Sequence, residues 1–118
     1  IIYKTVYEIK KKGSNIQDLI VVIGPCISKY NYEVKKDFLK KFINQNKKNI
    51  RFFNFSKKKI FFSLNEYIKN QLKDIGVKNI EIINKDTYLI KNNFFSHRRS
   101  LKNKYYDYGR NISVIMIK

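Results

Sequence analysis

The chain has 118 residues, and 43% of them are aliphatic or aromatic, which predicts one globular domain and excludes a disordered chain. Its 26 Lys and Arg against 9 Asp and Glu give a formal charge of +17. No apolar run approaches the roughly 18–20 residues that span a bilayer, and no basic-then-apolar leader opens the sequence. We therefore expect a single domain over residues 1–118, a cytoplasmic location and no membrane partner.

The first predicted element is a helix over residues 1–12. Ile2, Val6 and Ile9 share one face at helical spacing, and Gly13 is typical of a helix end. No side chain that caps helices precedes the first turn, whose N–H groups need partners. We therefore expect this chain to be the C-terminal part of a larger domain.

The later elements alternate between strands and helices. Continuous β-branched or aromatic runs predict strands, and 3.6-residue periodicity of apolar side chains predicts helices. The expected strands are 19–24, 50–55, 77–84 and 111–118, and the expected helices are 30–46 and 61–76, the second ending at Gly76. A long loop is expected before the last strand. This mixture predicts an α/β domain that is incomplete at its front.

The positive charge comes mainly from lysine that occurs throughout the sequence, together with 14 Asn. Coding rich in A and T produces this mixture, so the charge describes solubility more than a particular partner. We expect no specific nucleic-acid partner. The alternative is a basic nucleic-acid-binding module whose aromatic side chains stack on bases.

The chain has one cysteine and one histidine, Cys26 and His97. Zinc needs three or four ligands, so we predict that this chain by itself holds no metal. A nucleophilic Cys–His pair is formally possible, but a cysteine at the end of a buried strand is more often a small apolar side chain.

Arginine is concentrated in residues 92–113. The whole chain has four Arg, and three of them are Arg98, Arg99 and Arg110. A guanidinium group binds phosphate or carboxylate through two parallel hydrogen bonds, which Lys cannot copy. The pattern indicates an anion pocket, and the alternative is a structural role in which the arginines pair with buried carboxylates or carbonyls.

Two blocks in this order resemble the C-terminal half of the YfiH/laccase-domain family: VVIGPCISKYNYEV, and FFSHRR followed by GRNISVIMIK. The resemblance covers essentially the whole chain. Family members have been described as multicopper polyphenol oxidases, purine nucleoside phosphorylases and peptidoglycan-editing enzymes. The resemblance implies an α/β/β/α sandwich with mixed sheets. It also implies a zinc (or copper) ion held by two histidines and a cysteine upstream of this chain, and not by Cys26 or His97.

The activity implied by the resemblance is phosphorolysis of adenosine or inosine, a transferase reaction, with hydrolytic deamination of adenosine in some relatives. The implied partners are a purine nucleoside and phosphate, and we expect this chain alone to be inactive. Asp86 and the long tract 100–108 depart from the family pattern and affect the shape of the pocket. The residues expected to bind the substrate or the anion are Ser96, His97, Arg98, Arg99, Arg110, Gly24 and Cys26.

Overall fold

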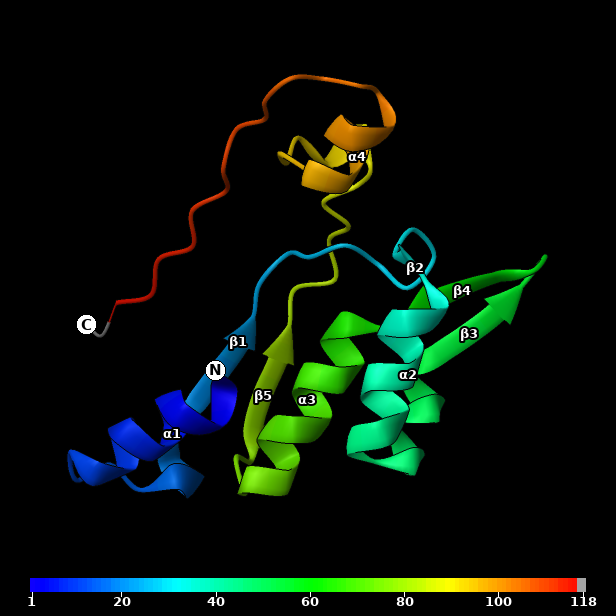
Figure 1. Ribbon diagram of the computed structural model, residues 1–118. Helices are drawn as coiled ribbons and strands as arrows, with labels where there is room; N and C mark the ends of the chain where they lie inside the picture. Colours follow the sequence, from blue (N-terminus) through cyan, green and yellow to red (C-terminus); the bar gives the residue numbers. More distant parts are fainter. Residues whose placement is uncertain (117–118) are drawn as a thin grey trace.

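The computed structural model describes residues 1–116, which fold into a mixture of helices and strands (Figure 1). The helices are α1 (Ile2–Lys11), α2 (Lys36–Gln45), α3 (Leu64–Ile75) and α4 (His97–Lys102). The strands are β1 (Ile20–Ile23), β2 (Glu33–Val34), β3 (Phe53–Ser56), β4 (Lys59–Phe62) and β5 (Asn79–Ile82). The predicted α/β class is confirmed. Among the described helices, none is both long enough and apolar enough to cross a membrane.

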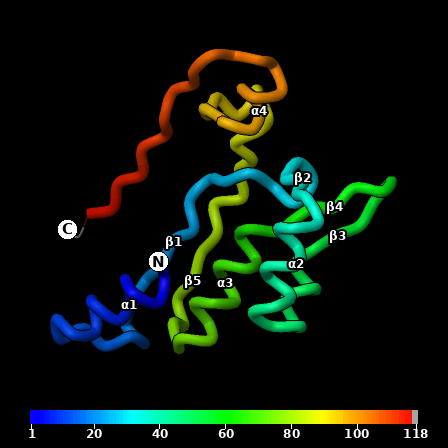
Figure 2. Tube along the Cα trace, in the orientation of Figure 1, coloured from blue at the N-terminus to red at the C-terminus, as the bar shows by residue number. Residues whose placement is uncertain are grey.

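The strands form two small sheets. In one sheet β1 and β5 are parallel, with Ile20 opposite Asn79 and Ile23 opposite Ile82. In the other sheet β4 lies between β2 and β3 and is antiparallel to both. The chain trace shows β1 and β5 side by side and the β3–β4 hairpin beyond α2 and α3 (Figure 2). Both parallel strands therefore end at the same edge of their sheet.

Helix α3 connects two hydrophobic cores. The first, called here the aliphatic core, contains the buried residues Val6, Ile23, Leu72 and Val77. The second, called here the aromatic core, contains the buried residues Phe52, Phe53, Ile60 and Phe62. The predicted apolar face of α3 is divided between them, since Ile68, Leu72 and Ile75 pack in the aliphatic core and Leu64 in the aromatic core. Gly76 ends the helix at φ +104, as predicted, because a residue without Cβ adopts this conformation readily.

Several predicted boundaries were wrong where a distant strand determines the local structure. Val34 was expected in a helix, but it pairs with Ile60 as part of β2, and α2 begins two residues later at Lys36. Phe62 was expected in the next helix, but it pairs with Phe53 in the hairpin. Periodicity within one segment carries no information about such partners, so hydrogen bonds across the sheet override it.

The C-terminal part of the chain also differs from expectation. Residues 111–116 were predicted to be a strand, but they have no regular secondary structure, and Ile112 and Val114 are 88% and 83% exposed. The rest of the predicted strand, 117–118, lies outside the described residues. Instead, the expected loop contains α4, whose first turn is capped by Ser96 through a hydrogen bond from the Arg99 backbone N–H at 3.3 Å.

Candidate functional site

The loops that follow β1 and β5 are joined by the carboxylate of Asp86. This side chain accepts hydrogen bonds from Ser28 Oγ at 2.5 Å, Asn31 Nδ2 at 2.7 Å and the Tyr88 backbone N–H at 2.8 Å. A β-bridge also pairs Cys26 with Asp86. Two loops that are about sixty positions apart in the sequence are thus held as one unit at the carboxyl ends of the parallel strands.

The hydrogen bonds to Asp86 also affect its protonation. Burial raises the pKa of the carboxyl group, but the hydrogen bonds from Ser28, Asn31 and the Tyr88 N–H outweigh burial and hold the pKa below its ordinary value. Asp86 is therefore ionised at neutral pH and accepts hydrogen bonds through both carboxylate oxygens. It acts as a structural anchor beneath the candidate site.

The two halves of the FFSHRR…GRN block meet through Asn111. Its Nδ2 donates to the Phe95 carbonyl at 2.8 Å, and its Oδ1 accepts from the Phe95 N–H at 3.0 Å. Gly109 lies against the Phe95 ring, because a Cβ at this glycine would be 2.5 Å from two ring carbons. Only glycine fits this close approach without moving the ring. The contacts of Gly109 and Asn111 with Phe95 therefore explain why the two halves of the FFSHRR…GRN block lie together in the structure.

A small cleft of about 300 Å³ opens where these segments meet. It lies between the loop after β1, the start of α4 and the segment that contains Gly109. The cleft is lined by Ile27, Tyr32, Thr87, Phe95, Ser96, His97, Arg98, Tyr108, Gly109, Arg110 and Asn111. Four of the seven residues expected to form a site are therefore brought together here, namely Ser96, His97, Arg98 and Arg110.

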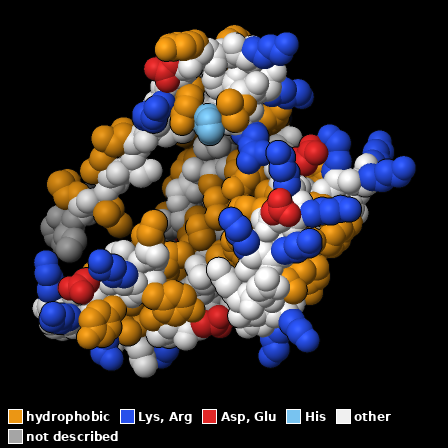
Figure 3. Space-filling model, viewed as in Figure 1, with side chains coloured by type: hydrophobic (Ala, Val, Ile, Leu, Met, Phe, Trp, Pro, Cys, Tyr) orange, Lys and Arg blue, Asp and Glu red, His pale blue; other side chains and the backbone are white. Residues whose placement is uncertain are grey.

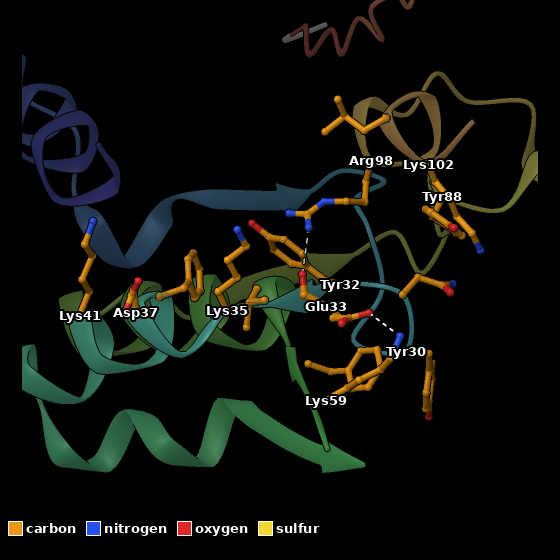
Figure 4. A pocket seen from close by; sticks show the side chains of 15 residues that line it. Tyr30, Tyr32, Glu33, Lys35, Asp37, Lys41, Lys59, Tyr88, Arg98 and Lys102 are labelled. Atoms are coloured by element: carbon orange, nitrogen blue, oxygen red, sulfur yellow. Dashed lines mark hydrogen bonds and ion pairs between the residues drawn. The ribbon is translucent and has the colours of Figure 1, made fainter. Parts of the chain in front are cut away.

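Arg98 extends from α4 across the wall of this cleft. Its Nη1 donates to the Glu33 carbonyl at 3.0 Å, and its guanidinium carbon lies 5.2 Å from the centre of the Tyr32 ring. Figure 4 shows the side chain reaching from α4 toward Tyr32 and Glu33. The side chain is exposed, so its remaining N–H groups are accessible to an anion.

His97, Tyr108 and Arg110 form a stack on the other side of the cleft. The rings of His97 and Tyr108 are 4.7 Å apart at an interplanar angle of 26°, and the Arg110 guanidinium carbon lies 4.0 Å from the Tyr108 ring centre. Arg110 also forms an exposed ion pair with Asp107 at 3.8 Å. The stack thus presents flat aromatic surfaces next to a cation.

Arg99 has a different environment from its two neighbours in the motif. Its guanidinium group donates to the carbonyls of Thr87 at 3.0 Å, Tyr88 at 2.8 Å and Phe94 at 2.5 Å. Three carbonyls accept hydrogen bonds from the guanidinium N–H groups of Arg99, and the side chain does not line the cleft. Arg99 therefore braces the loop that carries the site, which is the structural role left open by the sequence.

The structure places Gly24 and Cys26 outside the cleft. Ser113 Oγ lies 3.5 Å from the position that a Cβ on Gly24 would occupy, so this glycine lies beside the C-terminal segment. Burial, and secondarily the Asp86 carboxylate, raises the pKa of the Cys26 thiol. The thiol is therefore neutral at pH 7, which disfavours its use as a nucleophile.

The described residues do not fit a metal ion, because residues 1–116 contain no group of three or more His, Cys, Asp or Glu side chains that could hold one. Neither Cys26 nor His97 therefore belongs to such a group. No chemical step is therefore assigned to a metal held by these residues.

The residues that sequence reasoning missed include two that shape the cleft through side-chain contacts, Tyr108 and Asn111. Both flank the Gly109-Arg110 pair, so their position in the motif was a usable signal. The stacking of Tyr108 on His97 and the pairing of Asn111 with Phe95 join positions 11 to 16 residues apart, and no local pattern predicts them.

Comparison with known proteins adds the family. A family model described as "Multi-copper polyphenol oxidoreductase laccase" matches residues 1–118. The chain belongs to this family. The match bears out the resemblance to the YfiH/laccase-domain proteins, and the description of the family names copper.

Two curated relatives and one solved structure agree with this assignment. The chain is 38% identical over 102 residues to a purine nucleoside phosphorylase of Rickettsia conorii, with 85% of this chain and 42% of the relative covered. It is 35% identical over 120 residues to a purine nucleoside phosphorylase of Rickettsia prowazekii, with 100% and 49% covered. The crystal structure of the hypothetical protein YfiH of Bacillus licheniformis superimposes with a TM-score of 0.75 at 30% identity, over 86% of this chain and 40% of that one. The chain thus spans less than half the length of these family members.

Proposed function

We propose that the chain forms the phosphate-binding wall of a metal-dependent purine nucleoside phosphorylase-type active site. The observation that carries this proposal is the pair of accessible guanidinium groups, Arg98 and Arg110, that line one cleft together with an aromatic stack. The names of the two Rickettsia relatives support a purine nucleoside and phosphate as the substrates.

In phosphorolysis a phosphate oxygen attacks C1′ of the sugar while the bond from C1′ to the purine nitrogen breaks. The purine leaves with the bonding electrons and takes up a proton, and the products are the free base and the sugar 1-phosphate. Arg98 and Arg110 would hold the phosphate dianion through charge-assisted hydrogen bonds and orient one oxygen toward C1′. The chain contributes binding and orientation of the anion to this reaction.

The stack of His97 on Tyr108 would bind the base of the nucleoside. A purine is flat and has a large π surface, and offset stacking on aromatic side chains is favourable at separations such as the 4.7 Å between these two rings. Ser96 lies at the rim of the same cleft, but its hydroxyl oxygen already accepts the Arg99 N–H. Its contribution is to fix the start of α4.

The residues that hold the catalytic metal belong, in this proposal, to the other half of the family's domain. The described part of this chain lacks a suitable ligand group, and it covers 42% and 49% of the curated relatives. A chain without that half would be inactive. Deamination of adenosine by the complete domain is a second activity of the same proposed site.

The test uses two proteins, the 118-residue chain alone and the same chain fused behind the first half of the Rickettsia conorii relative. Each is incubated with inosine or adenosine and phosphate, and free base and sugar 1-phosphate are measured. We expect products from the fusion only. Equal activity of both proteins would overturn the assignment of the metal to the other half, and oxidation of a phenol without phosphorolysis by the fusion would overturn the proposed reaction.

The substitutions Arg98→Met and Arg110→Met, made in the fusion protein, test the proposed phosphate-binding wall. We expect each to raise the KM for phosphate about tenfold or more, because each removes a charge-assisted contact. The KM for inosine should change much less. Lys85→Met is the matched control, since it removes an exposed positive charge that does not line the cleft.

A further inference from the structure

A second hollow, called here the lysine groove, lies between α2 and the β3–β4 hairpin and has a volume of about 810 Å³. Apolar side chains and a rim of six lysines line it: Val34, Leu39, Phe55 and Ile60, with Lys35, Lys36, Lys40, Lys57, Lys58 and Lys59. In the space-filling view, Lys and Arg side chains gather on this side of the molecule (Figure 3). Folding thus concentrates lysines that appear evenly spread along the sequence.

The lysine groove continues toward the candidate site. A larger cleft of about 960 Å³ shares Glu33, Val34, Lys35 and Lys59 with it. The larger cleft in turn shares Tyr32 and Arg98 with the cleft described above. Figure 4 shows this middle section, which adds the cations Lys41 and Lys102 and the aromatic rings of Tyr30 and Tyr88. The three hollows form one track lined by cations and aromatic rings.

The hairpin tip places two lysines at the start of this track. Lys57 and Lys58 have φ of +48 and +62, the left-handed conformation that two-residue hairpin turns require. Asn and Gly adopt this conformation at lower cost than Lys. Coding rich in A and T supplies Asn as readily as Lys, and the chain contains 14 Asn. Two lysines therefore occupy turn positions that Asn or Gly would adopt at lower cost, and Lys104, outside the track, has a similar conformation with φ of +56.

Acidic side chains neutralise only part of the positive charge of this track. Glu33 and Asp37 are the acidic residues among the described lining of the lysine groove and the middle cleft. Glu33 pairs with Lys59 at 2.9 Å. Among the described residues of the lysine groove and the middle cleft, no other cation forms an ion pair.

We propose that this track binds a single-stranded nucleic acid, with phosphates on the lysine rim and bases on the aromatic rings. Spaced anionic charge and flat bases match the lysines and the rings of Phe55, Tyr30 and Tyr88 that line the lysine groove and the middle cleft. Base stacking on aromatic side chains does not depend on sequence. An anionic membrane is the competing ligand, and vesicle binding distinguishes it from a nucleic acid in the test below. The track shares Tyr32 and Arg98 with the cleft assigned above to phosphorolysis, so the experiments below change only residues outside that cleft.

The first experiment replaces the hairpin tip with Lys57→Asn and Lys58→Gly in the 118-residue chain. Binding of a fluorescent oligouridylate of about 12 nucleotides is measured by anisotropy at several salt concentrations. We expect roughly tenfold weaker binding and a slope of log K against log salt that is lower by about 1.4, because two phosphate contacts are lost. We also expect a higher melting temperature, since Asn-Gly suits this turn.

The matched control is Lys10→Gln with Lys11→Gln. It removes the same charge from α1, which lies on the opposite side of the molecule from the hairpin (Figure 1). Affinity and slope should stay near those of the unchanged chain. Equal loss in both variants would overturn the proposal, because net charge would then explain the binding. Binding to vesicles of anionic phospholipid that competes with the oligonucleotide and is tighter would also overturn it.

The second experiment tests stacking with Phe55→Ala. This side chain is 56% exposed, so its removal should affect folding little. Loss of one stacked base should weaken oligouridylate binding at least about fivefold and leave the salt slope unchanged. Unchanged affinity in a variant that still melts cooperatively would contradict a role for Phe55 in the track.

Discussion

The aromatic core and the segment 94–116 are stabilised in different ways. In the aromatic core Phe62 is fully buried, and its ring lies 4.9 Å from that of Phe42 and 5.2 Å from that of Phe38. In the segment 94–116 large apolar side chains such as Ile112 are exposed, and hydrogen bonds hold residues 94–111 in place. The stability of the aromatic core therefore depends on how well its side chains fill the space. The stability of the segment that carries the site depends on hydrogen bonds.

This difference predicts which substitutions each region tolerates. A core of interlocking rings accepts a polar change at its edge but not the loss of a central ring. A segment held by hydrogen bonds accepts changes of apolar side chains but not the loss of a donor whose acceptors are removed from water. The first three predictions below test this contrast, and the fourth concerns the Asp86 carboxylate.

The largest effect is expected from Phe62→Ala. Removing a fully buried ring should lower the free energy of unfolding by about 3–5 kcal/mol, because a cavity replaces its contacts. Urea unfolding followed by circular dichroism measures this. Phe55→Ala, on the neighbouring strand but exposed, should cost less than about 1 kcal/mol. Equal losses would show that packing does not distinguish the two sites.

The next effect contrasts two adjacent arginines. Arg99→Met leaves three carbonyls without their donor and should lower the free energy of unfolding by about 1–3 kcal/mol. Arg98→Met removes one exposed hydrogen bond and should cost less than about 1 kcal/mol. The same urea titration compares both. A larger loss at Arg98 than at Arg99 would reverse the roles assigned to them.

Gly109→Ala should have a smaller effect, about 1 kcal/mol, because the new Cβ must displace the half-exposed Phe95 ring. Phe95→Ala in the same chain removes the clash. A double-mutant cycle of thermal unfolding should therefore show that Gly109→Ala costs almost nothing when residue 95 is alanine. Additive effects would mean that the ring does not limit this position.

The smallest effect is confined to acid pH and concerns Asp86. Its pKa lies below the ordinary value of 3.8 in the folded chain, so the ionised carboxylate stabilises the fold above that pH. This contribution is lost as the pH falls through 3.8 and then through the lower pKa of the folded state. Unfolding measured from pH 6 to pH 2 should be less pH-dependent in Asp86→Asn. If Asp86→Asn loses as much stability at acid pH as the unchanged chain, this carboxylate is not the source of that loss.

Most of the aliphatic core could be predicted from the sequence. The faces of α1 and α3, with Val6 and Leu72 buried, follow from helical periodicity, and the end of α3 follows from Gly76. These features depend on residues within a few turns of one another. The hairpin partner of Val34 could not be predicted, because pairing with Ile60 joins positions 26 residues apart.

The candidate site was predicted in part. The concentration of arginine pointed to this segment, and Ser96, His97, Arg98 and Arg110 line one cleft in the structure. The sequence could not separate Arg98 from Arg99, since adjacent side chains of one type have the same local chemistry. Their roles diverge because one helical step turns Arg99 toward the carbonyls of Thr87, Tyr88 and Phe94.

The sequence by itself determined the family, the α/β class and the segment that carries the candidate site, because motifs and periodicity are properties of neighbouring residues. Only the tertiary structure decided which arginine side chains line the cleft and which one donates to three backbone carbonyls. It also decided that lysines from α2 and the β3–β4 hairpin form one groove. Both depend on contacts between segments far apart in the chain, and such contacts exist only after folding.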